Sequence, residues 1–92
     1  MSILTPIKIR NIGFFGMKKK FEEHYKTIGK NVKKLRKDQD LTQLELANKC
    51  TVNREQISRI ENARRDYMHS TLLEVCEALN VSVFEIMKPI TS

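Results

Sequence analysis

Three four-residue motifs constrain the fold of this chain more than any other feature. Each begins with a residue that favours helix N-termini and has Glu or Gln three positions later, and they start at Thr42, Asn53 and Ser82. In such a capping box, the first side chain accepts a hydrogen bond from a first-turn amide, and the later one reaches back to the cap amide. The motifs therefore predict short helices over residues 43–50, 54–62 and 83–88.

Apolar spacing predicts two further helices. A long amphipathic helix is indicated from Lys18 onward by residues spaced four and three apart, namely Phe21, Tyr25, Ile28, Val32 and Leu35. Gly29 costs about 1 kcal/mol of helix propensity, so we expect this helix to begin properly near Thr27.

A second stripe predicts a helix over residues 70–79, formed by Leu72, Leu73, Val75, Cys76 and Leu79. Asp66, His69 and Ser70 compete as its cap. The expected fold is all-α with five short helices.

The chain is basic, and its charge is unevenly distributed. It has 92 residues, enough for one domain, with a net charge of +6. Residues 1–37 hold eleven of the 17 basic residues and two of the 11 acidic ones. Such an end can dock on a polyanion, or it can be an ordinary solvated helix face.

The composition also bears on compartment and domain organisation. No apolar run approaches a bilayer span, and Lys8 and Arg10 interrupt any signal-peptide core. With two cysteines and no export signal, we expect a reducing, cytoplasmic location. Residues 1–17 differ in composition and are expected to be a short N-terminal arm or an unstructured leader. The folded domain is expected over residues 18–92.

The predicted helices over residues 43–50 and 54–62 are expected to form a helix-turn-helix over residues 42–62. Only three residues, 51–53, separate them, and so tight a connection forces a sharp angle between the helices. Apolar residues stand where the two helices must touch, namely Leu44, Ala47, Val52, Ile57 and Ile60.

The opposite face of the 54–62 helix is polar. Glu55, Ser58, Arg59 and Asn62 share this face, and Arg54 stands at the helix start. Side chains of these types carry the donors and acceptors that read base edges in a DNA groove. The alternative is a helix that merely faces solvent, which the preceding helix and tight turn make less favoured.

Residues 28–87 resemble the Cro/C1-type, or XRE-like, helix-turn-helix family. The segments LTQLELA, ISRIENARR and STLLEVCEALNVSVFEIM carry the resemblance, in that order and spacing. It implies a compact, five-helix, lambda-repressor-like domain that binds double-stranded DNA.

The resemblance also implies residue roles. The base-facing positions are Arg54, Glu55, Ser58 and Arg59. The phosphate-contacting positions are Gln43, Asn53, Asn62 and Arg64. Arg36 and Glu61 match a paired Arg and Glu in the family. Glu61 also lies near the buried side of the predicted 54–62 helix, where a carboxylate needs a partner such as arginine.

Four positions depart from the family pattern or fit it awkwardly. Thr51 and Ala63 stand where Gly is common, so the left-handed backbone expected at Thr51 would be strained or reshaped. Met68 stands where a capping residue is usual. Glu55 faces a polyanion, and two roles are open for it: accepting from cytosine N4, or orienting Arg54 or Arg59.

Other chemistry has little support. Cys50 and Cys76 are too far apart for a C-x-x-C pair and are interpreted as core residues. His24 and His69 have no ligand partners at metal spacing. No nucleophile and base form a recognisable catalytic motif, so we expect no enzyme activity, no metal and no cofactor.

The last predicted helix offers a candidate dimer interface. Val83, Phe84, Ile86 and Met87 provide more apolar surface than five short helices need, although they could simply close the monomer core. A dimer would read two half-sites of a palindromic operator. We therefore expect a dimeric repressor or autoregulator. The alternatives are an antitoxin of a toxin–antitoxin pair or a restriction–modification controller, with a toxin or polymerase as a possible protein partner.

Overall fold

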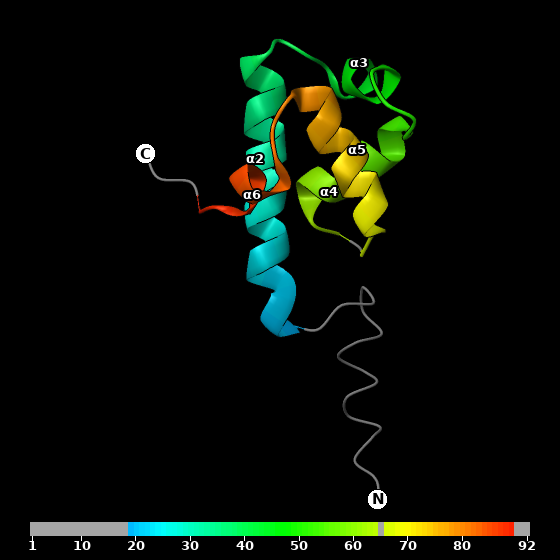
Figure 1. Cartoon of the computed structure of the whole chain (residues 1–92). Helices are drawn as coiled ribbons and strands as arrows, with labels where there is room; N and C mark the ends of the chain where they lie inside the picture. Colours follow the sequence, from blue (N-terminus) through cyan, green and yellow to red (C-terminus); the bar gives the residue numbers. More distant parts are fainter. Residues whose placement is uncertain (1–18, 65, 90–92) are drawn as a thin grey trace, which may run out of the picture.

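The computed structural model describes residues 19–64 and 66–89. One turn of 3-10 helix, η1 (Lys19–Phe21), leads into five α-helices, which confirms the all-α prediction (Figure 1). These are α2 (Glu22–Asp38), α3 (Gln43–Asn48), α4 (Arg54–Asn62), α5 (His69–Leu79) and α6 (Val83–Met87). The expected arm, residues 1–17, lies outside the described residues. Within them, no helix combines the length and apolar character needed to cross a membrane.

All three predicted capping boxes are present. In the first, Thr42 Oγ1 accepts from the Glu45 amide at 3.0 Å, and Glu45 Oε1 accepts from the Thr42 amide at 2.8 Å. Those at Asn53 and Ser82 are formed in the same way. By contrast, none of the three competing residues caps α5, because its N-cap is Met68, which makes no side-chain capping hydrogen bond.

Gly29 does not delay the start of α2, contrary to expectation. The helix begins at Glu22 and runs through the glycine without a break. A Cβ atom at Gly29 would lie 2.5 Å from the carbonyl oxygen of Ile60 and 2.6 Å from that of Glu61. The glycine therefore lets α2 approach the last turn of α4, and this packing outweighs its low helix propensity.

The core lies where the helices meet, and three predicted apolar residues are missing from it, the first of them Phe21, which is 45% exposed in η1. Leu46 is fully buried, whereas Leu44 is 55% exposed and does not join the two helices of the motif. Leu73 is likewise 44% exposed. The buried apolar residues are Ile28, Val32, Leu46, Ala47, Val52, Ile57, Ile60, Leu72, Val75, Cys76, Leu79 and Ile86.

The turn between α3 and α4 closes without the left-handed residue expected at Thr51. Among the described residues, positive φ angles occur at Asp40, Ala63 and Asn80. Thr51 instead donates from its amide to Glu74 Oε1 at 3.2 Å, and its hydroxyl donates to the same oxygen. Ala63, which ends α4, has a left-handed backbone conformation instead, with φ 51° and ψ 38°.

The short helix α6 is tied to α2. Asn31 Nδ2 donates to the carbonyl oxygens of Ile86 at 2.7 Å and Lys88 at 2.6 Å. Ile86 is fully buried, so it belongs to the core rather than to the exposed surface expected for a dimer. Phe84 and Met87 remain exposed.

Candidate nucleic-acid interface

Helix α4 is held by one face and open on the other. Ile57 and Ile60 are fully buried on the side where α4 contacts α2 and α3. Arg54, Glu55 and Arg59 are exposed on the other side. The buried pair therefore fixes the helix while leaving its polar side chains accessible.

The four residues predicted to face bases share one surface. Arg54, Glu55, Ser58 and Arg59 line an open hollow of about 300 Å³, and Arg64 lines it as well. Arg64 was expected to contact phosphate beyond the end of the helix, and here it borders the same surface. We name these five residues the α4 surface.

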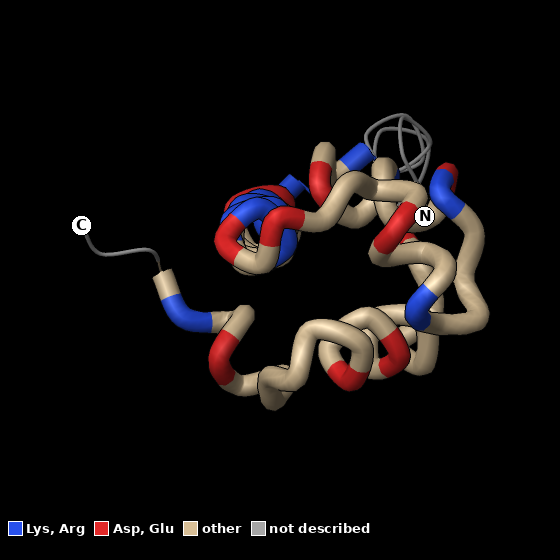
Figure 2. Tube along the Cα trace, turned by 90° about the horizontal axis from the view of Figure 1, so that it is seen from above, with Lys and Arg blue, Asp and Glu red and all other residues tan. Residues whose placement is uncertain are grey.

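The charge of the α4 surface differs from that of helices α5 and α6. The α4 surface holds three arginines and one glutamate. Helices α5 and α6 contain glutamates and neither lysine nor arginine, while α2 carries five of the nine lysines of the described residues (Figure 2). A polyanion is therefore attracted to the α2–α4 part of the molecule rather than to α5 and α6.

A buried ion pair joins α2 to α4. Arg36 Nε donates to Glu61 Oε2 at 2.6 Å, and Arg36 Nη2 donates to Glu61 Oε1 at 3.1 Å. The two side chains are 9% and 2% exposed. Arg36 Nη1 also donates to the carbonyl oxygen of Leu41 at 2.7 Å, so the guanidinium is satisfied on both sides.

This ion pair extends to two residues of the candidate interface. Gln43 Nε2 donates to Glu61 Oε1 at 3.1 Å, and Gln43 Oε1 accepts from Arg54 Nη1 at 3.4 Å. Gln43 and Arg54 are the first residues of α3 and α4. The chain of contacts thus fixes how the two helix starts sit together, a link that the sequence analysis missed.

The remaining predicted contact residues have local partners. Asn53 Oδ1 accepts from the Gln56 amide at 2.9 Å as the cap of α4. Asn62 Nδ2 donates to the carbonyl oxygen of Ser58 at 2.8 Å and to its hydroxyl at 3.2 Å. Among the ion pairs of the described residues none includes Glu55, so its orienting role is not seen in this structure.

The cysteines are unpaired and do not form a site with each other. Cys76 is buried, and burial, followed by the charge of Glu85, raises the pKa of its thiol to about 11. Cys50 is half-buried and donates through Sγ to the carbonyl oxygen of Leu46 at 3.3 Å. Over the described ranges, no three His, Cys, Asp or Glu side chains gather as metal ligands would.

Comparison with known proteins places the motif in a family. A helix-turn-helix family model matches residues 32–86. The chain is 42% identical over 60 residues to the antitoxin PezA of Streptococcus pneumoniae, a match covering 65% of this chain and 38% of that protein. It is 38% identical over 61 residues to the immunity repressor of Bacillus phage phi105, covering 66% and 42%. The chain thus spans about two fifths of the length of these two relatives.

A third relative and two solved structures are similar over most of their length. An uncharacterised HTH-type transcriptional regulator of Sinorhizobium fredii is 34% identical over 64 residues, covering 70% of this chain and 83% of that protein. A hypothetical transcription factor from Neisseria shares the fold, with a TM-score of 0.67 at 24% identity over 72% of this chain and 76% of that one. The restriction–modification controller C.Esp1396I, solved as a tetramer on its 35-base-pair operator, gives 0.61 at 29% identity over 67% and 82%. The chain therefore belongs to the Cro/C1-type, XRE-like helix-turn-helix family.

Proposed function

We propose that this chain is a sequence-specific regulator of transcription that binds double-stranded DNA by placing α4 in the major groove. The observation that carries the proposal is the α4 surface, where four polar residues of one helix and Arg64 border a single open hollow. A major groove admits an α-helix, and arginine can donate two hydrogen bonds to guanine O6 and N7. The relatives named as a repressor and as a transcriptional regulator support this reading.

Arg54 and Arg59 are the candidates for direct base reading in this proposal. Both are exposed, and no ion pair to a carboxylate engages either of them among the described residues. Arg54 is further oriented by Gln43, which itself rests on buried Glu61. Glu55 lies between the two arginines in the sequence, where its carboxylate can accept from cytosine N4.

Phosphate contacts would hold the helix in register. Gln43 at the start of α3 and Asn53 at the start of α4 lie where first-turn amides and the helix dipole favour an anion. Arg64 adds a positive charge beyond the end of α4. Because such contacts displace counterions, affinity should fall steeply as salt rises.

Selection of bound duplexes from a random pool, followed by fluorescence anisotropy, tests this function. We expect Arg59→Ala to cost about 1–3 kcal/mol at the selected site and to relax discrimination against a scrambled duplex. Lys88→Ala is the matched control, since it removes an exposed positive charge just after α6 and should change affinity little. Equal losses on both duplexes would refute base reading by Arg59.

We propose further that the chain acts as a homodimer through α6. Phe84 is 73% exposed and Met87 is 39% exposed, while Val83 is half-buried beside them. Two copies related by a twofold axis could read half-sites about 34 Å apart. In sedimentation equilibrium, Phe84→Asp should shift a wild-type dimer to monomer and weaken operator binding; a wild-type monomer at micromolar concentration would refute the proposal.

A further inference from the structure

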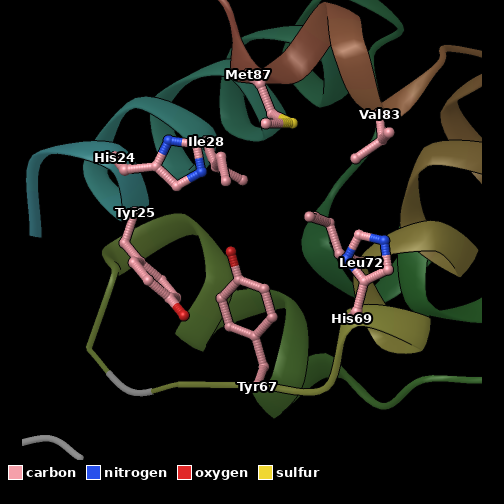
Figure 3. A pocket seen from close by; sticks show the side chains of 8 residues that line it. All are labelled: His24, Tyr25, Ile28, Tyr67, His69, Leu72, Val83 and Met87. Carbon is pink, nitrogen blue, oxygen red and sulfur yellow. The ribbon is translucent and has the colours of Figure 1, made fainter. Parts of the chain in front are cut away.

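A second hollow lies between α2, α5 and α6, away from the α4 surface (Figure 3). Its volume is about 180 Å³, and none of the five residues of the α4 surface lines it. Ile28 and Leu72 form a floor that is continuous with the core, and Val83 and Met87 contribute the side formed by α6. We name this hollow the α6 pocket.

Tyr67 brings a hydroxyl group into this apolar setting. In Figure 3 its hydroxyl points into the space enclosed by the labelled side chains. The oxygen is buried and has no hydrogen-bond partner among the described residues. Burial raises the pKa of this phenol, so it stays protonated at neutral pH and remains a donor. Because buried hydroxyls are almost always paired, the unpaired one marks a position for a missing acceptor.

The neighbouring tyrosine does not supply that acceptor in this structure. The rings of Tyr25 and Tyr67 meet edge to face with centroids 5.5 Å apart. The Tyr25 hydroxyl, however, donates to Asp66 Oδ1 at 2.6 Å and points away from the pocket centre. Access from solvent lies past His24, which is exposed and is not among the α6 residues proposed for the dimer. Met87 is unbranched, so its side chain can adjust to a small molecule on the pocket side.

We propose that the α6 pocket binds a small, uncharged, mostly apolar molecule whose one hydroxyl or carbonyl oxygen accepts a hydrogen bond from Tyr67. The volume suits a single six-membered ring, because a dry cavity of about 150 Å³ binds benzene. A charged ligand would lose its hydration against the walls formed by Ile28, Leu72 and Val83. For so few ligand atoms, the expected affinity is in the millimolar range.

Phenol and toluene are the probes that separate polar recognition from simple cavity filling. Each is titrated into the 92-residue chain while two-dimensional NMR follows the amides of residues 67, 72 and 83. Tyr67→Phe removes only the hydroxyl and should weaken phenol binding about five-fold, while toluene binding stays the same. Tyr25→Phe is the matched control, because the hydroxyl it removes is bonded to Asp66, and it should leave phenol binding unchanged.

Folding does not obscure the outcome. Tyr67→Phe removes a buried polar group without a partner, so its melting temperature should be no lower than that of the wild type. Val83→Met lengthens a side chain that lines the pocket, fills part of it and should weaken both probes. If neither probe saturates, the pocket is closed or filled in solution and the proposal is wrong. The same conclusion follows if phenol binds Tyr67→Phe as well as the wild type.

Discussion

Gly29→Ala tests whether the contact between α2 and α4 governs the fold. Helix propensity alone predicts stabilisation by about 1 kcal/mol, because alanine replaces glycine within a helix. The structure predicts the opposite sign. The added Cβ would lie 2.5 Å from the carbonyl oxygen of Ile60 and 2.6 Å from that of Glu61, whereas ordinary contact begins at 3.4 Å. Both oxygens belong to the backbone, which cannot rotate away as a side chain could. The two helices would have to separate by roughly 0.9 Å, the difference between these distances.

The expected result is a net loss of stability. Overpacking of this kind costs about 1–3 kcal/mol and occasionally more, and here the same separation pulls on the buried pair of Arg36 and Glu61. Because the Cβ meets backbone atoms, we take the upper end of this range, about 3 kcal/mol, so that after the gain of about 1 kcal/mol in propensity the free energy of unfolding should fall by about 2 kcal/mol. With a urea m-value near 1 kcal/mol/M, the midpoint would fall by roughly 2 M.

Urea unfolding followed by circular dichroism measures this change. Lys30→Ala is the control on the neighbouring exposed position of α2, and it should shift the free energy by no more than about 0.5 kcal/mol. An unchanged or higher midpoint for Gly29→Ala would show that α2 and α4 can move apart freely, which would refute the reasoning.

Three further predictions concern other parts of the fold. Glu61→Gln should cost about 3–5 kcal/mol in urea unfolding, because it leaves the Arg36 charge buried without its partner; a cost below about 1 kcal/mol would contradict this. Ala63→Gly should raise the unfolding free energy by about 1 kcal/mol, since it relieves a left-handed backbone, and a decrease would argue against that conformation. The thiol of Cys76 has a pKa near 11 in the fold against 9.0 ordinarily, so its contribution to stability is complete below pH 9 and is lost as the pH rises toward 11. The wild type should therefore lose more stability than Cys76→Ala between pH 9 and pH 11, and parallel profiles would contradict the burial argument.

Local signals in the sequence predicted the starts of α3, α4 and α6. The capping boxes at Thr42, Asn53 and Ser82 depend on side chains three residues apart, so they form as soon as each first turn forms. The polar face of α4 follows from the buried positions of Ile57 and Ile60. These features need no information about distant parts of the chain.

The features that were missed depend on distant partners. Helix propensity alone makes Gly29 unfavourable in α2. Its role depends on close contact with carbonyl oxygens of α4, which are more than 30 residues away in the sequence. The six residues of α3 are too few for apolar spacing to fix which leucine is buried. The prediction that Leu44 is buried is therefore wrong, and Leu46 is the buried leucine. The contact of Gln43 with Glu61 and the unpaired hydroxyl of Tyr67 likewise arise only when the helices pack together.

The most direct test of the central proposal maps the DNA contact on the protein itself. A duplex selected from a random pool is added to isotopically labelled protein, and amide chemical shifts are followed by NMR. The proposal predicts the largest changes at residues 54, 55, 58 and 59 of α4 and at residue 43 of α3, with α5 and α6 little affected. Changes concentrated on α5 and α6, with α4 unperturbed at saturation, would contradict it.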